Sequence, residues 1–425
     1  IERFYSTRRT VFMALVKPFR SIRPVKELAG RIAALPYDVY NREEAKKETL
    51  AEPLSFLAID RAETQLGDHV STYDDIVYDK ARQLLEEMIE QGNMFLDEEE
   101  AYYIYQLTMD GRSQSGIVAC SSIDDYLDGT IKKHEKTRQD KEIDRIKHVD
   151  ALNAQTGPIF LAYRAEKVID DTVAQVQKEE PIYSFDSADG VGHKVWKVTN
   201  ADKIKLISDA FDKIDNTYIA DGHHRTASAV KVGLKRREEN PGYVGDEEFN
   251  FFLSVLFPHN QLMIMPYNRA VKDLNGLTVD EFFDAIKGNF NVKLIGKEAY
   301  SPLTKGEFGM YIDDNWYCLN PKEELNIPND PVSSLDVSIL QDYLLQPILA
   351  IEDPRTDNRI DFIGGIRGLN ELERRVEGDM KVALSMYPTS IDELLDVADA
   401  DMLMPPKSTW FEPKLRSGLF IHSLE

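Results

Sequence analysis

The chain has 425 residues, more than a single hydrophobic core usually serves, so two domains are expected. Asp and Glu (74) outnumber Lys and Arg (51), and the formal charge of −23 argues against a surface that coats duplex DNA. The two cysteines, Cys120 and Cys318, lie far apart, which favours buried thiols over a disulfide framework or a cysteine-built metal site. No apolar run approaches the roughly 18–20 residues of a membrane span, so a cytoplasmic protein is predicted.

The first segments suggest an extension followed by a polar turn. Residues 1–12 are expected to be a non-native or disordered extension, because the basic pair Arg8 and Arg9 precedes Met13. Residues 35–39 predict a strand and turn, with Asp38 exposed at the strand end. That place suits a general base or a magnesium ligand, although an Asx turn explains the aspartate equally well.

Short apolar segments then alternate with amphipathic helices, which predicts an α+β fold. Residues 76–91 have helical periodicity, whereas residues 102–107 and 159–163 read as strands. Residues 143, 146, 149 and 152 are apolar and step by three, so this helix is expected to cover a core with that face.

Residues 131–138 carry a dense set of proton-transfer and basic groups between a strand and that helix. His134 or Glu135 could take a proton from a hydroxyl nucleophile, while Lys136 and Arg138 could bind phosphate. A solvated charged loop is an equal alternative for this segment.

The clearest local signal is a strand, a tight turn and a helix across residues 217–232. Asp221 is expected to be the N-cap. His223, His224 and Arg225 would then lie in the first helical turn, which opposes the helix dipole unless an anion binds there. Backbone N–H groups after Gly222 could bind phosphate oxygens, with help from the Arg225 guanidinium and the hydroxyl that follows it. That hydroxyl belongs to Thr226.

A domain boundary is placed near residue 275, so that residues 13–275 form a nucleotide-binding domain and residues 276–425 a smaller α+β domain. In the second domain a helix is expected at residues 279–287, strands at 292–295 and 308–312, and a long helix at 337–350. A proline-rich loop near the C-terminus, with Lys407 and Thr409, could return to the site and close over a ligand.

The Asp-Gly-His-His-Arg unit resembles the phosphate-binding box of the ParB/sulfiredoxin superfamily, where a Gly-x-x-Arg turn at a helix start holds nucleotide phosphates. Here that turn is Gly222–Arg225. Further segments along the chain, from Lys17-Pro18-Phe19-Arg20 to Lys407-Ser408-Thr409, resemble the ParB-like family known as domain of unknown function 1015. The resemblance covers nearly the full length and implies a ParB/sulfiredoxin-like nucleotide-binding domain.

Within that superfamily the turn is similar to that of the archaeal free-serine kinases. The resemblance implies phosphoryl transfer from ATP or ADP, with Mg²⁺, to a small hydroxyl compound, and free L-serine is the expected acceptor. On this interpretation Arg225 and the turn backbone hold the donor phosphates, and His223 or His224 neutralises the transferred group. Glu135 or Asp38 would deprotonate the acceptor.

Two other functions stay open at this point. One is a nucleotide-gated ParB-like binding module without phosphoryl transfer, for which the negative charge makes DNA an improbable cargo. The other is a metal-assisted phosphatase or hydrolase, with ligands among His223, His224, His134 and Glu135. In each case the expected partners are a nucleotide and a small molecule without a membrane, and a homodimer is compatible with the sequence. The identity of any metal ligand is not specified by the sequence.

Overall fold

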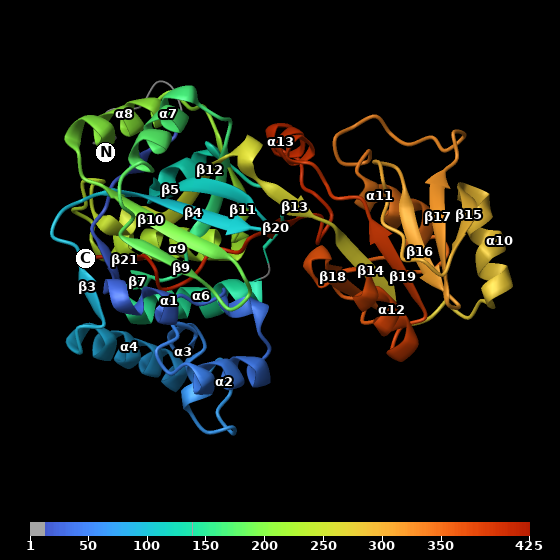
Figure 1. The fold of residues 1–425 in the computed structure, drawn as a ribbon, viewed down its shortest axis with the longest axis horizontal. Coiled ribbons are helices and arrows are strands. Elements are labelled where there is room, and N and C mark those ends of the chain that lie inside the picture. The colour runs from blue at the N-terminus through green and yellow to red at the C-terminus, as the bar shows by residue number, and fades with distance from the viewer. Residues whose placement is uncertain (1–12, 138) are drawn as a thin grey trace. The chain divides into compact units, whose positions relative to one another are not determined.

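The protein is seen in a computed structural model that describes residues 13–137 and 139–425 (Figure 1). The extension predicted at residues 1–12 and the candidate phosphate ligand Arg138 lie outside the described residues. The chain groups into two compact units. The first holds the chain up to Lys133, Thr137–Leu262 and Pro413–Glu425, and the second holds His134–Lys136 and Met263–Glu412.

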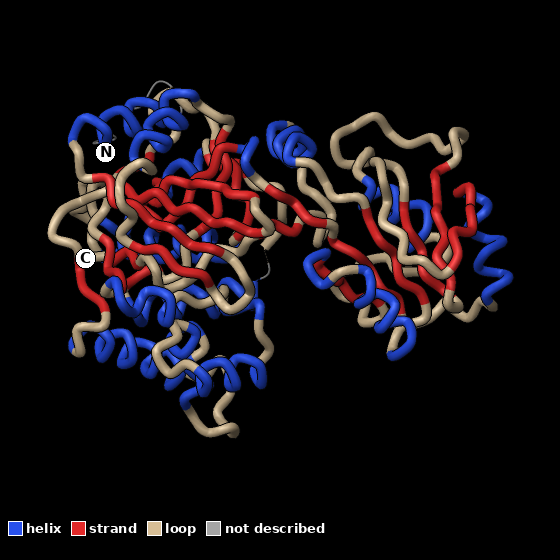
Figure 2. Tube along the Cα trace, in the orientation of Figure 1, coloured by secondary structure: helices blue, strands red, loops and turns tan. Residues whose placement is uncertain are grey.

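A nine-stranded mixed sheet forms the centre of the first unit. In spatial order its strands are β6 (Ile131–Lys132), β11 (Thr217–Asp221), β8 (Ile159–Tyr163), β12 (Phe251–Pro258), β5 (Arg112–Ser122), β4 (Tyr102–Met109), β10 (Gly192–Val198) and β9 (Tyr183–Asp186), with β1 (Val16–Lys17) paired to β5. β11 lies parallel to β6 and β12 parallel to β8, whereas the other pairs are antiparallel. Figure 2 shows these strands in the middle of the unit, with helices outside them.

Nine α-helices belong to the first unit as the structure describes it. They are α1 (Ala29–Ile32), α2 (Arg42–Ala51), α3 (Leu57–Asp60), α4 (Asp75–Glu90), α5 (Ile123–Asp128), α6 (Gln139–Leu152), α7 (Lys167–Val176), α8 (Ala201–Phe211) and α9 (His223–Glu239). One apolar core joins the sheet to α7, α8 and α9, with Ile159 and Ile219 at its centre. A second core packs α3 against α4 through Leu57 and Leu85.

The chain's end is built into this unit. β21 (Ile421–Ser423) lies in a four-stranded antiparallel sheet between β2 (Ser21–Pro24) and β7 (Ala154–Gln155), and β3 (Met94–Leu96) completes the sheet beside β2. This pairing fixes residues 413–425 against elements from the start of the chain. Lys414 thereby pairs with Asp221 at the end of β11, and Ser417 bridges to Ala34.

The second unit has its own antiparallel sheet. Its six strands, in spatial order, are β15 (Phe290–Gly296), β17 (Asn315–Pro321), β16 (Phe308–Ile312), β19 (Val382–Met386), β14 (Tyr267–Val271) and β18 (Ile360–Gly364). A separate pair joins β13 (Met263–Met265) to β20 (Trp410–Glu412). The helices are α10 (Val279–Asn289), α11 (Asp336–Leu340), α12 (Leu369–Gly378) and α13 (Ile391–Asp399).

The structure confirms the mixed α+β class and most predicted elements, including α4, β4, α10 and β16. Both cysteines are buried free thiols, as expected. Within the described residues, no helix is long and apolar enough to cross a membrane.

Two local predictions were wrong in part. Residues 37–39 form a 3₁₀ helix after Pro36, which matches the predicted turn but not the predicted strand. The long helix at residues 337–350 is short: α11 ends at Leu340 and continues as a π-helical turn over Gln341–Leu345.

The apolar stripe of α6 faces the core over most of its length. Leu152 is buried, and Ile146 and Val149 pack against a core cluster of Val232, Phe249 and Leu424, whereas Ile143 is 48% exposed. The polar residues Asp144, Arg145 and His148 are buried on the same helix.

Candidate functional site

The turn between β11 and α9 depends on a glycine. Gly222 has φ of +97°, in the left-handed region that L side chains rarely adopt. A Cβ at this position would lie 3.1 Å from Nε of Arg225, because the Arg225 guanidinium folds back against the turn. The strand, turn and helix predicted from the sequence are thus confirmed, and the turn is compact because both Gly222 and Arg225 occupy it.

The prediction that Asp221 is the N-cap was wrong. Asp221 ends β11, and the N-cap position belongs to Gly222, which has no side chain to cap the helix. Instead, the Asp221 carboxylate accepts a hydrogen bond from Nζ of Lys414 at 3.1 Å. Burial raises the pKa of Asp221, but Lys414 and Arg225 outweigh it, so this pKa lies well below its usual value and the carboxylate is charged.

The first turn of α9 is basic and contains no acidic residue. His223 is buried, and Nη1 of Arg225 donates to the Pro158 carbonyl at 2.5 Å. Thr226 is fully buried, and its hydroxyl donates to the Gly222 carbonyl at 3.0 Å. This hydroxyl is therefore bonded within the helix. The helix dipole and the Arg225 charge both favour an anion in front of the turn.

Arg225 also lines a cavity inside the first unit. The cavity is small: the space between its lining residues measures about 490 Å³ only when the open solvent at its mouth is included. The polar side chains on its wall come from six separate parts of the chain and are those of Tyr37, Asp60, Arg145, His148, Gln155, Thr156, Arg225 and Ser417.

Helix α6 contributes Arg145 and His148 to the cavity wall. Nε of Arg145 donates to Oδ2 of Asp144 at 2.9 Å, and its Nη2 lies 2.8 Å from the same oxygen. The Arg145 guanidinium also stacks on the Tyr37 ring at 3.9 Å from the ring centroid. Oδ1 of Asp144 accepts a hydrogen bond from the Tyr78 hydroxyl at 2.9 Å. These contacts hold Arg145 in one orientation although it is buried.

Asp60 and His148 lie together on the same cavity wall. The Thr156 hydroxyl donates to Oδ1 of Asp60 at 3.0 Å, and Nε2 of His148 lies 3.8 Å from that oxygen. Burial and the nearby Arg145 lower the pKa of His148 to about 4, against the opposing effect of Asp60. His148 is therefore neutral at pH 7, and Asp60 supplies the negative charge of this wall.

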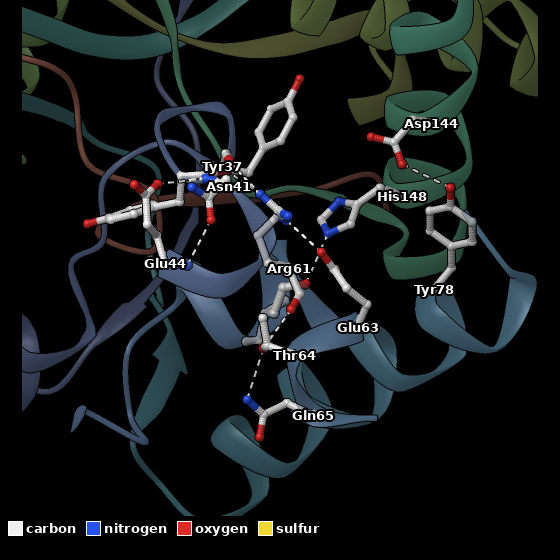
Figure 3. Close-up of polar contacts among 12 residues, drawn as sticks. Tyr37, Asn41, Glu44, Arg61, Glu63, Thr64, Gln65, Tyr78, Asp144 and His148 are labelled. Carbon is white, nitrogen blue, oxygen red and sulfur yellow. Dashed lines mark hydrogen bonds and ion pairs between the residues drawn. The ribbon is translucent and has the colours of Figure 1, made fainter. Parts of the chain in front are cut away.

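A second layer of polar contacts supports this wall (Figure 3). In that view Tyr78 and Asp144 lie on one side of His148, and Arg61 and Glu63 on the other. Nη1 of Arg61 donates to the carbonyls of Tyr37 and Tyr40 at 3.0 and 2.7 Å, and its Nε donates to Glu63 at 2.7 Å. Arg61 directly follows Asp60 in the chain, so these bonds connect the 3₁₀ turn that contains Tyr37 to the segment that contains Asp60.

The predicted catalytic residues fall into both units. Asp38 is exposed and adjoins Tyr37 in the first unit. His224 lies in the first turn of α9, in the same unit. His134, Glu135 and Lys136 belong to the second unit.

The predicted C-terminal loop is divided between the units: Lys407 and Thr409 belong to the second unit, whereas the residues from Pro413 on belong to the first. Within that unit the Met404 N–H donates to the His134 carbonyl at 2.8 Å, which brings two predicted segments together. That these segments act with Arg225 stays a prediction.

The sequence reasoning missed Asp60, Arg145 and His148. One signal was available: Glu142, Arg145 and His148 step by three along α6, so they share a face. Asp60 carries no local signal, because it reaches the site only through packing. Lys414 lies in the proline-rich C-terminal loop that was expected to close over a ligand, but it was not named as a site residue.

A protein-built metal centre has little support. Among residues 13–137 and 139–425 as described, no group of three or more His, Cys, Asp or Glu side chains is placed to hold a metal ion. Asp221 is the carboxylate nearest in sequence to the turn. Since Mg²⁺ usually binds through one or two carboxylates together with substrate phosphates, the residues fit a magnesium ion that arrives with a nucleotide.

These features define a mixed α+β protein with a basic helix-start turn that opens on a polar cavity. Residues 16–338 match the family described as "Protein of unknown function (DUF1015)". This match spans more than half of the chain, so the protein belongs to that family, as predicted.

The fold was also compared with solved structures. A glutamate-to-alanine mutant of free serine kinase in complex with ADP is 14% identical, with a TM-score of 0.34 and coverage of 72% of this chain and 92% of that one. A conserved hypothetical protein from Pyrococcus furiosus is 15% identical, with a TM-score of 0.34 and coverage of 72% and 94%.

A C-terminally truncated SbnI from Staphylococcus aureus is 10% identical, with a TM-score of 0.36 and coverage of 72% and 87%. No match is found among curated proteins. Because these TM-scores lie below 0.5, the function is argued below from the chain's own residues.

Proposed function

We propose that the protein binds ATP or ADP at the Gly222–Arg225 turn and transfers a phosphoryl group to a small hydroxyl compound, with free L-serine as the expected acceptor. The observation that carries this proposal is the position of Arg225. Its guanidinium lies against Gly222 at the start of α9 and lines the same cavity as the buried Arg145. A phosphate at the turn and a small molecule in the cavity would therefore be neighbours.

The turn suits a phosphate for two reasons. The first N–H groups of a helix have no intrahelical partners and carry a partial positive charge. The glycine lets the Arg225 guanidinium lie against the backbone of the turn, since a Cβ at position 222 would lie 3.1 Å from its Nε. Arg225 adds a fixed full charge beside these N–H groups. The resemblance to the ParB/sulfiredoxin phosphate-binding box, which we retain as part of the proposal, rests on the same four residues.

In the proposed reaction the acceptor oxygen attacks the terminal phosphorus of the donor. The new P–O bond forms as the bond to the departing ADP or AMP breaks, and the acceptor proton passes to a carboxylate. Glu135 and Asp38 are the two proposed bases. His223 or His224, with Arg225, would compensate the charge of the transferred group. Such a reaction depends mainly on positioning and charge compensation, which this site supplies.

Magnesium would enter with the nucleotide. Asp221 is charged and lies directly before the turn, so it would hold a magnesium ion bound to the phosphates. The ion would neutralise phosphate charge during transfer. Lys414, which pairs with Asp221, limits how much negative charge this carboxylate presents to the phosphates.

The test is a transfer assay with magnesium, using ATP and separately ADP, against a panel of free hydroxy amino acids. Wild type is compared with Glu135→Gln, Asp38→Asn and Arg225→Ala. We expect phosphoserine from wild type, and loss of the product with Arg225→Ala and with one of the two carboxylate variants.

The results separate the alternatives. Tight nucleotide binding without transfer to any acceptor would contradict the kinase and favour a nucleotide-gated binding module. Release of inorganic phosphate in place of phosphoserine would favour a hydrolase.

A further inference from the structure

The cavity beside Arg225 carries a second pair of charges that the proposed nucleotide site does not use. Arg145 and Asp60 are both buried and both line the cavity. In the described part of the chain, no ion pair within 4.0 Å joins Arg145 to Asp60. Arg145 pairs with Asp144 instead. Asp60 lies 3.8 Å from Nε2 of His148, which is neutral at pH 7. Two opposite charges therefore face one cavity without neutralising each other directly.

Each of these groups keeps one bonding position open. Arg145 uses Nε and Nη2 on Asp144, and Nη1 makes no hydrogen bond with any described residue. Asp60 uses Oδ1 for the Thr156 hydroxyl, and Oδ2 likewise makes no hydrogen bond with the described residues. Neither atom is fully enclosed, so a polar ligand or water in the cavity can bond both.

The other polar groups of this wall are neutral. His148 is uncharged at pH 7, and burial raises the pKa of the Tyr37 hydroxyl to about 12. The Ser417 hydroxyl lines the cavity and makes no hydrogen bond with the described residues. Apart from Arg225, the cavity thus presents the cation of Arg145 and the carboxylate of Asp60, and its other polar side chains are neutral.

We propose that this pair is the acceptor subsite, in which Arg145 binds the carboxylate of a small zwitterionic hydroxy compound and Asp60 binds its ammonium group. The inference rests on the proposed function for the role of the ligand, and on the cavity alone for its chemistry. The neutral hydroxyls and Arg225 would then surround the acceptor's own hydroxyl. Arg145 and Asp60 are specificity-determining residues in this arrangement.

The contacts behind Arg145 fit such a role. Asp144, Tyr78 and the Tyr37 ring fix the guanidinium plane, and a rigid fork recognises a carboxylate better than a flexible ammonium group does. Replacement by lysine keeps the charge beside Asp144 and removes the fork. The variant Arg145→Lys therefore separates recognition from folding.

The experiment measures ligand binding by calorimetry, with and without a non-hydrolysable ATP analogue. The ligands are L-serine, glycerate, which lacks the ammonium group, and ethanolamine, which lacks the carboxylate. The variants are Arg145→Lys, Asp60→Asn and Lys147→Met. Lys147 is the matched control, because it lies on the same helix but pairs with Asp75 on the surface.

We expect ethanolamine and glycerate to bind wild type at least tenfold more weakly than serine. Arg145→Lys should weaken the binding of serine at least tenfold and leave the binding of ethanolamine unchanged. Asp60→Asn should weaken the binding of serine and leave the binding of glycerate unchanged. Lys147→Met should stay within twofold of wild type. Equal weakening of serine and ethanolamine by Arg145→Lys, or no binding of any ligand to wild type, would overturn the subsite.

The comparison of ligands on wild type keeps the test valid even where a variant is unstable. The same data separate the two proposals. Serine binding with this pattern but without phosphoryl transfer would refute the kinase and leave the subsite standing. Transfer to serine whose KM is unchanged in Arg145→Lys and Asp60→Asn would refute the subsite and leave the kinase standing.

Discussion

The two walls of the cavity carry their charges in different ways. The α9 wall is built from consecutive residues, and the basic first turn of that helix contains no acidic residue. The α6 wall is built from residues far apart in the chain, and its arginine is already bonded to Asp144. A wall with excess positive charge suits a strongly charged phosphate, whereas a wall with balanced charge suits a polar ligand without large net charge.

This difference indicates how the two proposed ligands would be distinguished. The dipole and Arg225 act on any anion near the turn, so they give affinity more than selectivity. In the proposed subsite a ligand would bond both Arg145 and Asp60, so a ligand that lacks one of the two groups would leave a polar position unbonded. The four predictions that follow test this contrast, from the largest expected effect to the smallest.

Replacing the turn arginine should have the largest effect. Arg225→Ala is expected to weaken nucleotide binding about 100-fold, because a charge-assisted contact to phosphate is lost. The free energy of unfolding should fall by only about 1 kcal/mol, the usual net value of one hydrogen bond such as that to Pro158. Calorimetry and chemical denaturation measure the two quantities. Arg237→Ala, near the end of the same helix, is the control; a comparable loss of affinity in that variant would contradict a local role for Arg225.

His148, on the α6 wall, should make the free energy of unfolding depend on pH. His148 has a folded pKa of about 4, below its usual 6.5, so its contribution is fully present above pH 6.5 and is lost as the pH falls towards 4. Between pH 7 and pH 4, wild type should lose roughly 1–3 kcal/mol more than His148→Gln, which cannot gain a proton. Denaturation across that pH range measures the difference, with the exposed His69→Gln as control. Parallel pH profiles for wild type and His148→Gln would show that His148 is not held neutral.

The turn glycine should affect both stability and binding. Gly222→Ala places a side chain at φ of +97° and 3.1 Å from the Arg225 guanidinium. We expect a loss of about 1–2 kcal/mol in the free energy of unfolding and roughly tenfold weaker nucleotide binding, since Arg225 must move. Gly242→Ala is the matched control, because a Cβ there meets nothing within 4 Å. Unchanged nucleotide affinity in Gly222→Ala would mean that the phosphate does not sit at this turn.

The smallest effect is expected at the pair beside the turn. Lys414→Met removes the partner of Asp221, so the carboxylate repels the phosphates more strongly. Nucleotide affinity measured without magnesium should fall three- to fivefold, a change of less than about 1 kcal/mol. Added magnesium should reduce this difference, because the ion compensates the carboxylate. Tighter binding in the variant without magnesium would contradict the proposed place of Asp221.

The sequence by itself determined the glycine turn before α9 and most of the regular elements. Gly222 permits a backbone that other residues resist, and the strand before it and the helix after it follow from residues within a few positions. Such local constraints act before any distant contact forms. The strands β4 and β8 and the helices α4 and α10 were predictable for the same reason.

Only the tertiary structure decided that α6 is buried on its polar side as well as its apolar side. Leu152, Ile146 and Val149 pack on core clusters as their periodicity predicts, but Arg145 and His148 are buried too, which periodicity does not indicate.

Part of the reason lies in distant contacts. Asp60 lies 88 residues before His148, and Tyr78 lies 66 residues before Asp144, so no local pattern contains these contacts. Such long-range contacts compensate a burial cost that a sequence window counts as prohibitive, and they form the polar wall on which the acceptor subsite is proposed.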